Sequence, residues 1–450
     1  MLEESSLISL LDNFIQKNRE SIDNNLKNLI YKDYLTGLYN RRSLIRLFDL
    51  MKSSDLLKKL TLFVMDLDEF KIINDSFGQS IGDLVLKKVS KVLTDTCKDV
   101  YIARIAGDEF IIIYENLENI EKIKSISNRI LSQINEIYLS EINFREISVS
   151  IGVVIDNYNK KDLNDLLIKG DLALCKAKML GKNTSVIFEP YLEEERKLKV
   201  DMINELVYDI KNNKNVELYY QPQYTYNNKL IGFEALFRWN NEKYRNISIE
   251  KIIKIIENSK YFDYLNNFVI RNALKFAKKV NTNKNEFIIV SINISAKQLM
   301  NLNFKNKLLK LIKEEDVSPN TIALELKETV LLQDLNTNIN KIQSLKDFGI
   351  LIYLDDFGTS YSSLNYLIKL PLSRVKVDKY FISQAIKGEK YLKILKSIIY
   401  ICHILKLPVF AEGVENIEQL NILRNLNVDY IQGFLFAKPL PEDEVLKLLN

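Results

Sequence analysis

The sequence predicts an α+β unit followed by a modified (β/α)8 barrel of α/β type, and three observations lead to this prediction. The chain has 450 residues and is 47% apolar, enough for two or three domains with sizeable cores. Strand-like and helical runs follow no strict alternation in the first half, whereas strand and helix alternate over residues 203–450. Eight apolar runs of the second half end on or beside a polar group, near Gln221, Glu234, Asn293, Glu325, Asp355, Lys376, Glu412 and Gln432.

The composition excludes several classes of protein. A net charge of +4 is small for this length and does not indicate a surface for a nucleic-acid polymer. No run reaches the ~18 apolar residues of a membrane span, and the N-terminus lacks the pattern of a secretory signal. The three cysteines form no C-x-x-C pair, so a reducing, cytoplasmic location is expected. A single histidine, His403, argues against a zinc or non-haem iron site.

The chain is expected to divide into four segments. Residues 1–32 predict an N-terminal helix, because apolar residues recur near every 3.5–3.6 positions, and both packing on its own domain and dimerisation remain open for it. Residues 33–190 form the first unit, with strands expected at 61–66, 101–104, 109–114, 147–153 and 185–188. A charged linker helix at 191–202 leads to the second unit, residues 203–450.

Three motifs of the first unit point to nucleotide and metal chemistry. DLDEFKIIND begins at Asp66 after the apolar run LTLFVM, so a strand would present carboxylates to Mg²⁺ there. AGDEF, residues 106–110, predicts a hairpin whose tight turn carries Asp108 and Glu109 and lets a phosphate approach the backbone. In AKMLGKN, Lys178 and Lys182 are four residues apart, which predicts one helix face that meets phosphates.

These motifs, with DYLTGLYNRRSL at 33–44 and SVSIGV at 148–153, resemble the GGDEF domain of the diguanylate cyclases. The resemblance implies a nucleotide-cyclase-like palm that binds GTP. It implies that Asp66 and Asp108 bind metals and that Glu109 is a supporting carboxylate. Asn74 and Asp83 would contact guanine edges, and Lys178 and Lys182 would hold the distal phosphates.

Two departures from that family's pattern affect the expected activity. Ala106 stands where the signature has its first glycine, and Cys97-Lys98-Asp99-Val100 replaces the Arg-x-x-Asp motif of product inhibition. The resemblance therefore implies that the inhibitory site is absent. A methyl group at Ala106 is compatible with nucleotide binding, so GTP binding without strong cyclase activity is favoured over an active cyclase.

Adjacent carboxylates mark the second unit. Asp355 and Asp356 follow an apolar run in LDDFGTSYSSL. Taken alone, the pair is as typical of a helix N-cap or a solvated turn as it is of a metal site. Two such carboxylates in one site repel each other unless cations neutralise them. Two metals can activate a water and stabilise the leaving oxygen of a phosphodiester, and Lys376 can balance charge on the phosphoryl group.

The second unit resembles the EAL domain of the cyclic di-GMP phosphodiesterases from YYQPQ (219–223) to FAKPL (436–440), through FEALFRW, SINISA, ALELKET, FAEGVE and IQGF. The resemblance implies a barrel with one strand antiparallel to the others, and hydrolysis of cyclic di-GMP to linear pGpG with Mg²⁺ or Mn²⁺. The implied metal ligands are Glu234, Asn293, Glu325 and Asp355, with Asp356 for a second metal.

The same resemblance assigns the remaining polar residues. Lys376 and Glu412 would position or deprotonate the attacking water, and Glu328 would anchor the loop at 357–363. Three further residues would hold the substrate or order the site: Gln221, Arg238 and Gln432. Ser360, where glycine is frequent in the family, is the one notable departure and is not expected to inactivate the enzyme.

The sequence thus favours a cytoplasmic, metal-dependent cyclic di-GMP phosphodiesterase whose first domain binds GTP as a regulator. A homodimer is expected from the family resemblance. Two alternatives stay open: a bifunctional cyclase and phosphodiesterase, and a receptor that binds the nucleotides without catalysis. The retained carboxylates, with Lys376, count against the receptor.

Overall fold

The computed structural model describes residues 30–53, 58–140, 142, 147–158, 162–282, 286–328, 335–358 and 364–449. Most of the N-terminal helix expected over 1–32 and most of the loop at 357–363, Ser360 included, lie outside the described residues. The chain divides into two compact units after Leu198, and each unit is described by itself.

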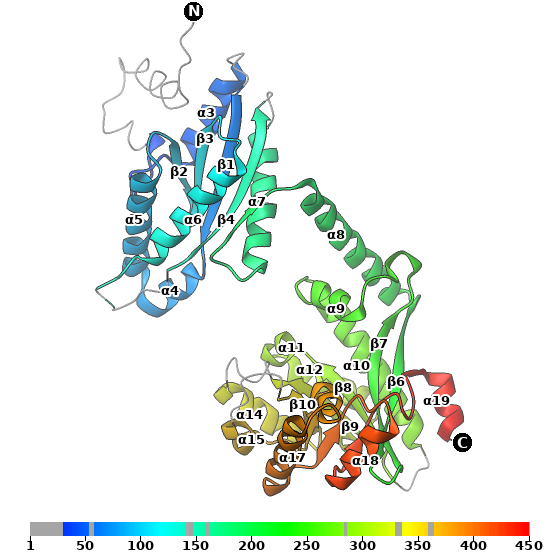
Figure 1. The fold of residues 1–450 in the computed structure, drawn as a ribbon. Coiled ribbons are helices and arrows are strands. Elements are labelled where there is room, and N and C mark those ends of the chain that lie inside the picture. The colour runs from blue at the N-terminus through cyan, green and yellow to red at the C-terminus, as the bar shows by residue number, and fades with distance from the viewer. Residues whose placement is uncertain are drawn as a thin grey trace, which may run out of the picture. The chain divides into compact units, whose positions relative to one another are not determined.

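The first unit is a five-stranded mixed sheet with helices on both faces (Figure 1), which confirms the α+β prediction. Strand order is β2-β3-β1-β4-β5, with β4 and β5 parallel and the other pairs antiparallel. The strands are β1 Lys58–Leu67, β2 Tyr101–Ala106, β3 Glu109–Glu115, β4 Val149–Tyr158 and β5 Ser185–Ile187. The helices are α3 Arg41–Ser53, α4 Phe70–Phe77, α5 Gln79–Thr96, α6 Ile120–Asn135 and α7 Leu163–Met179.

The alternation of apolar side chains along β1 divides the core of this unit in two. Phe63 and Met65 pack in the cluster that contains apolar residues of α5 and α6. Leu62 and Val64 pack in the cluster formed with α3 and α7. Successive strand residues point to opposite faces, so one uninterrupted apolar run fills both layers and leaves Asp66 near the strand end.

A single helix, α8 Pro190–Lys211, contains the boundary between the two units. It covers the expected linker at 191–202 and extends beyond it to Lys211, shortly before the first barrel strand. Its apolar residues Met202, Leu206, Val207 and Ile210 belong to the core cluster of the second unit.

The second unit is a closed barrel of eight strands. Strands β7 to β13 pair in parallel, and β6 pairs antiparallel with both β7 and β13, which closes the barrel. The expected barrel with one strand antiparallel to the others is therefore confirmed, and that strand is the first one, β6. The strands are β6 Val216–Thr225, β7 Leu230–Trp239, β8 Ile289–Ile294, β9 Ile322–Lys327, β10 Leu351–Phe357, β11 Arg374–Val377, β12 Val409–Ala411 and β13 Tyr430–Ile431.

Helices surround the barrel and bury its outward-facing apolar residues (Figure 1). They are α9 Ile249–Glu257, α10 Phe262–Asn281, α11 Ala296–Met300, α12 Phe304–Glu314, α14 Leu335–Lys346, α15 Leu364–Lys369, α16 Lys379–Ala385, α17 Glu389–Ile404 and α18 Ile417–Asn425. A short strand β14 Leu440–Pro441 pairs with β6 and precedes α19 Glu442–Leu449. Within the described ranges, no helix has both the length and the apolar character needed to cross a bilayer.

Candidate functional site

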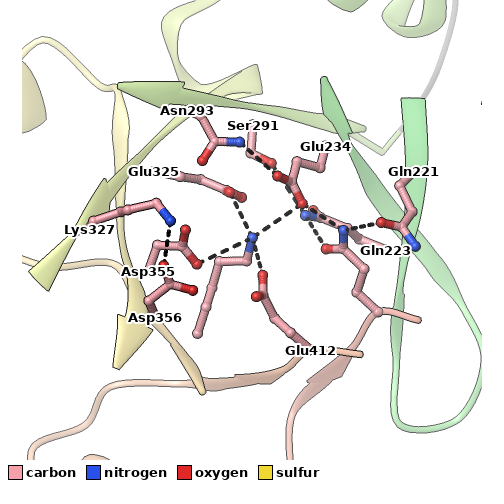
Figure 2. Close-up of polar contacts among 12 residues, drawn as sticks. Gln221, Gln223, Glu234, Ser291, Asn293, Glu325, Lys327, Asp355, Asp356 and Glu412 are labelled. Atoms are coloured by element: carbon pink, nitrogen blue, oxygen red, sulfur yellow. Dashed lines mark hydrogen bonds and ion pairs between the residues drawn. The ribbon is translucent and has the colours of Figure 1, made fainter. Parts of the chain in front are cut away.

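The polar residues predicted at the strand ends converge inside one end of the barrel (Figure 2). Glu325, Asp355 and Lys376 lie on the neighbouring strands β9, β10 and β11, and Glu412 follows β12 directly. One part of the prediction is wrong: Gln221 and Glu234 pair with each other in the middle of β6 and β7, rather than at the ends of their strands. Because β6 runs antiparallel to its neighbours, its middle meets the site while its C-terminal end leads away from it.

Lys376 is the centre of the site. The residue is fully buried, and its Nζ lies 2.7 Å from Glu325 Oε2 and 3.4 Å from Glu234 Oε2. Glu412 forms a closer ion pair with the same ammonium group, and Asp355 Oδ1 lies 4.0 Å away. A buried ammonium group with several carboxylate partners is held in one position. If it moved away, the carboxylates would remain as buried charges without a counter-ion, which is costly.

Amide side chains fix the orientation of Glu234. Asn293 Nδ2 donates to Glu234 Oε1 at 2.7 Å, and Gln432 Nε2 donates to Glu234 Oε2 at 2.6 Å. Gln432 Nε2 also donates to Gln221 Oε1 at 2.9 Å, and Gln432 Oε1 accepts a hydrogen bond from Gln223 at 3.0 Å. These charge-assisted and amide hydrogen bonds hold one carboxylate toward the centre of the barrel.

The carboxyl groups respond differently to burial beside Lys376. Burial raises the pKa of Glu234, but Lys376 and the hydrogen bonds from Gln432 and Asn293 outweigh it and leave that pKa below its usual value. Burial and the neighbouring Glu234 hold the pKa of Glu325 well above its usual value. Burial, opposed in part by Lys376, raises the pKa of Glu412 to about 8. A bound cation would therefore compete with protons for Glu325 and Glu412.

Two buried oxygens show that the site can accept a cation. Glu325 Oε1 and Asp355 Oδ1 are buried and have no hydrogen-bond partner. Acceptor oxygens without a partner are costly in a protein interior unless a donor or a metal satisfies them. Ligand oxygens of two groups, Glu234–Glu325–Glu412 and Asp355–Asp356–Glu412, each lie within 4.8 Å of one another. Carboxylate oxygens in this arrangement suit hard divalent cations such as Mg²⁺ and Mn²⁺.

An irregularity in β10 brings both adjacent aspartates to the site. The pairing of β10 with β11 shifts register between Leu354 and Phe357, and Asp356 has a φ of 55°. Consecutive strand residues normally point to opposite faces, and such a bulge changes the direction of one of them. Asp356 Oδ2 accepts a hydrogen bond from Lys327 Nζ at 2.5 Å, as Figure 2 shows.

Arg238 and Glu328 are the two remaining predicted residues of the barrel site. Arg238 is four residues beyond Glu234 on β7, where its guanidinium donates to the Phe237 carbonyl at 2.9 Å and lies 5.4 Å from the Tyr219 ring centroid. Glu328 is buried at the helical turn that follows β9. The loop that it is expected to anchor lies largely outside the described residues.

Sequence reasoning missed three residues of the network. Gln223 donates to both Gln432 and Ser291, and Lys327 pairs with Asp356. Gln223 could have been found, since it is two residues beyond Gln221 and faces the same side of the strand. Lys327 follows Glu325 by the same spacing, but a lysine at a strand end is usually a solvated surface residue.

The first unit places its predicted carboxylates together at the end of the β1–β3 pair. Asp66 pairs in register with Glu109, and Asp108 occupies the adjoining turn. Burial and the charge of Asp66 raise the pKa of Asp108. The pKa of Glu109 is raised by burial and by Asp171 of α7, a neighbour that sequence reasoning missed.

The guanine-contacting residues predicted in this unit lie on adjacent helices. Asn74 of α4 faces α5 closely enough that a Cβ added at Gly82 would lie 2.0 Å from its Oδ1. Asp83 follows Gly82 and is exposed. Asn74 is half-buried against the residue that precedes Asp83, and Asp83 is accessible from solvent.

The prediction that Lys178 and Lys182 share a helix face is wrong. Helix α7 ends at Met179, and Lys182 has a φ of 65° beyond its end. Left-handed residues after Gly181 terminate the helix and turn the chain. Lys178 instead contacts Asp66 at 2.6 Å, and Lys182 contacts Glu69 at 2.5 Å.

The turn that carries the altered signature accommodates Ala106 without backbone strain. In the described hairpin, Gly107 has a positive φ of 52°, whereas the φ of Ala106 is not positive. Ala106 is exposed at the end of β2. Arg104 Nε donates to the Gly107 carbonyl at 2.8 Å and supports the turn. The position of the turn that favours glycine, residue 107, is therefore still a glycine.

Comparisons with known proteins agree with this architecture. The family model of the EAL domain matches residues 203–439, and that of the diguanylate cyclase GGDEF domain matches residues 30–184. Cyclic di-GMP phosphodiesterase NbdA of Pseudomonas aeruginosa is 30% identical over 98% of this chain, which covers 56% of that protein. Cyclic di-GMP phosphodiesterase PdeR of Escherichia coli is 28% identical over 92% of this chain, which covers 63% of that protein. The chain thus spans little more than half of these relatives.

Solved structures show the same barrel. A structure described as "PaMucR Phosphodiesterase, c-di-GMP complex" is 26% identical with a TM-score of 0.52, and the match covers 54% of this chain and 99% of that one. The EAL enzyme Bd1971, solved in a cAMP- and cyclic-di-GMP-bound form, is 28% identical with a TM-score of 0.54 over 68% of this chain and 82% of that one. The chain belongs to the EAL domain family and carries a diguanylate cyclase GGDEF domain ahead of its barrel.

Proposed function

We propose that this protein hydrolyses cyclic di-GMP to linear pGpG in a reaction that depends on Mg²⁺ or Mn²⁺. The observation that carries the proposal is the convergence of four carboxylates around the buried Lys376 at one end of the barrel, with Asp356 beside two of them. The relatives named as cyclic di-GMP phosphodiesterases and the complex of the similar barrel with c-di-GMP support the choice of substrate.

Each residue has a role in this proposal. Glu234, Asn293, Glu325 and Asp355 would hold one cation, and Asp356 with Glu412 would complete the group for a second. When bound, the cations supply Lewis-acid stabilisation of the phosphodiester and lower the pKa of a water. Glu412 lies beside Lys376, so it can take the proton of the attacking water while Lys376 holds the carboxylates in place.

Substrate binding requires residues at the opening of the site. Gln221 and Gln432 order the Glu234 carboxylate, and Arg238 lies farther along β7, where its guanidinium can meet a phosphate. The attack is in line, with the oxygen on the 3′ side leaving, so a single cut of the cyclic dinucleotide yields pGpG.

A variant of Glu234 tests the proposal. Glu234→Ala removes the carboxylate that three neighbouring side chains orient, so hydrolysis of cyclic di-GMP should fall by about a hundredfold or more. The measurement is chromatographic separation of the nucleotides after incubation with Mg²⁺. The control is Glu314→Ala, which removes a carboxylate paired with Arg271 on the outside of the barrel and should leave turnover unchanged. Wild-type turnover in Glu234→Ala would sink the assignment.

We further propose that the first domain binds GTP with little cyclase activity and regulates the barrel. The grouping of Asp66, Asp108 and Glu109, with Asn74 beside Asp83, supports nucleotide binding. A bifunctional protein is the second candidate, because the turn keeps Gly107 at positive φ and Ala106 adds no strain.

A further inference from the structure

Lys327 is a cation in the site that the proposed mechanism does not use. It is the last residue of β9 and pairs in register with Asp355 of β10. It is two residues beyond Glu325, so both side chains point to the same face of the strand. Its Nζ reaches Asp356 Oδ2 at 2.5 Å, within the group Asp355–Asp356–Glu412 (Figure 2).

The backbone of β10 turns Asp356 toward this lysine. A non-glycine residue with a φ of 55°, beside a shift of strand register, is an uncommon conformation that the surrounding structure has to hold. The conformation gives Asp355 and Asp356 a common direction. The carboxylate that results needs a positive partner, and Lys327 supplies one in the absence of a metal.

Lys327 and Lys376 differ in how freely they can move. Lys376 has 1% of its side chain exposed and contacts several carboxylates at once. The side chain of Lys327 is 58% exposed, and that of Asp356 is 29% exposed. A long, exposed side chain can move its ammonium group into water at little cost, because an exposed ion pair contributes at most about 1 kcal/mol.

We propose that Lys327 is a displaceable counter-ion at the second cation site: its ammonium group neutralises Asp356 until a divalent cation takes its place. The inference rests on the proposed function, since it takes Asp355, Asp356 and Glu412 as ligands of a divalent cation. The ammonium group and the cation need the same carboxylate and repel each other. Lys327 therefore raises the concentration of Mg²⁺ or Mn²⁺ at which the second site fills.

Calorimetric titration of the full chain with Mn²⁺, without substrate, tests the inference. Lys327→Gln should bind the second Mn²⁺ about fivefold more tightly, because the variant loses an exposed ion pair that competes for Asp356. Affinity at the first site should stay the same. Lys327→Arg keeps the positive charge and should bind Mn²⁺ as the wild type does. Lys327→Thr provides the same comparison if the glutamine variant fails to fold.

The matched control is Lys279→Gln. Lys279 belongs to the same unit, its side chain is 57% exposed, and it lies 2.5 Å from Glu442. Its removal changes net charge by the same amount but touches no residue of the site, so Mn²⁺ affinity should equal that of the wild type. As a second readout, Mg²⁺ should raise the Tm of Lys327→Gln more than that of the wild type, since the variant leaves Asp356 without its ammonium partner when metal is absent.

The possible outcomes separate this inference from the proposed function. Two Mn²⁺ ions bound with equal or weaker affinity in Lys327→Gln would overturn the counter-ion role and leave the phosphodiesterase proposal intact. A single ion in both proteins would overturn it as well. Failure of every variant and of the wild type to bind Mn²⁺ would reject the metal-dependent function itself.

Discussion

Lys376 carries an ammonium group in a buried side chain, and its position explains the electrostatics of the barrel site. Burial lowers the pKa of this lysine, but the surrounding carboxylates outweigh burial and hold the pKa well above its usual value. The carboxylates therefore favour the charged form of the lysine despite its burial. In return, it keeps the pKa values of Glu234 and Glu412 lower than burial alone would make them.

Replacing this lysine tests that interdependence. Lys376→Met leaves buried carboxylates without a cation, which should cost about 3–5 kcal/mol of unfolding free energy in metal-free buffer at pH 8. The loss of stability should be smaller at pH 5. A carboxyl whose pKa is raised by folding destabilises the protein only above its unfolded pKa, and this effect decreases as the carboxyl binds a proton at lower pH. Urea unfolding with EDTA at both pH values measures this. Equal losses at pH 5 and pH 8 would contradict the electrostatic explanation.

At the scale of elements, strand direction and strand irregularity decide which residues meet. The barrel and most of its rim residues were predictable, because a parallel strand that ends on Glu325 or Asp355 delivers that group to a shared edge. The position of Gln221 in the middle of β6 was not predictable, because composition does not give the direction of that strand. The bulge at Asp356 and its pairing with Lys327 depend on register between strands, which no single apolar run encodes.

The first unit shows the same limit at a helix end. Spacing alone placed Lys178 and Lys182 on one face, but α7 stops at Met179 before the second lysine. Gly181 in the sequence was the available signal for that end. The sheet was predictable because its strands are continuous apolar runs, whereas Asp171 was not, since a charged residue on a helix usually faces water.

The β2–β3 hairpin gives a prediction at this scale. In a Glu234→Ala background, which preserves any product, Ala106→Gly should raise formation of cyclic di-GMP from GTP by about tenfold, or 1.4 kcal/mol. The reason is that removal of the methyl group lets a phosphate approach the turn more closely. Chromatography of the nucleotides measures the rate.

The control for that prediction is Gly107→Ala. It adds a Cβ at a φ of 52°, so it should lower the rate by straining the turn. If the parent with Ala106 already forms cyclic di-GMP as fast as Ala106→Gly, the protein is bifunctional and the regulatory interpretation of its first domain is wrong.

At the scale of the whole molecule, two units with separate cores share one uninterrupted helix. The core clusters of the palm and of the barrel are distinct, and α8 runs from the end of one unit into the core of the other. A ligand of the first unit can affect the second only if it binds two states of the molecule with different affinity.

Regulation by GTP is tested on the full chain. Saturating GTP should change kcat or KM for cyclic di-GMP by about fivefold or more. A fivefold change is the smallest effect that is usual when two binding sites are coupled. Asp83→Ala should shift the effect to higher GTP concentrations, because the variant removes a residue expected to contact guanine. Hydrolysis rates that GTP leaves unchanged, at concentrations shown to saturate binding, would rule out the regulatory role.

Turnover of cyclic di-GMP by the purified wild-type protein tests the central claim most directly. The protein is incubated with cyclic di-GMP and Mg²⁺ or Mn²⁺, and the nucleotides are separated over time, with EDTA in a parallel reaction. We expect linear pGpG as the product, formed only when the divalent cation is present, because the carboxylates around Lys376 need it for the reaction. Cyclic di-GMP that binds the protein and is recovered intact with either metal would contradict the claim and identify a receptor.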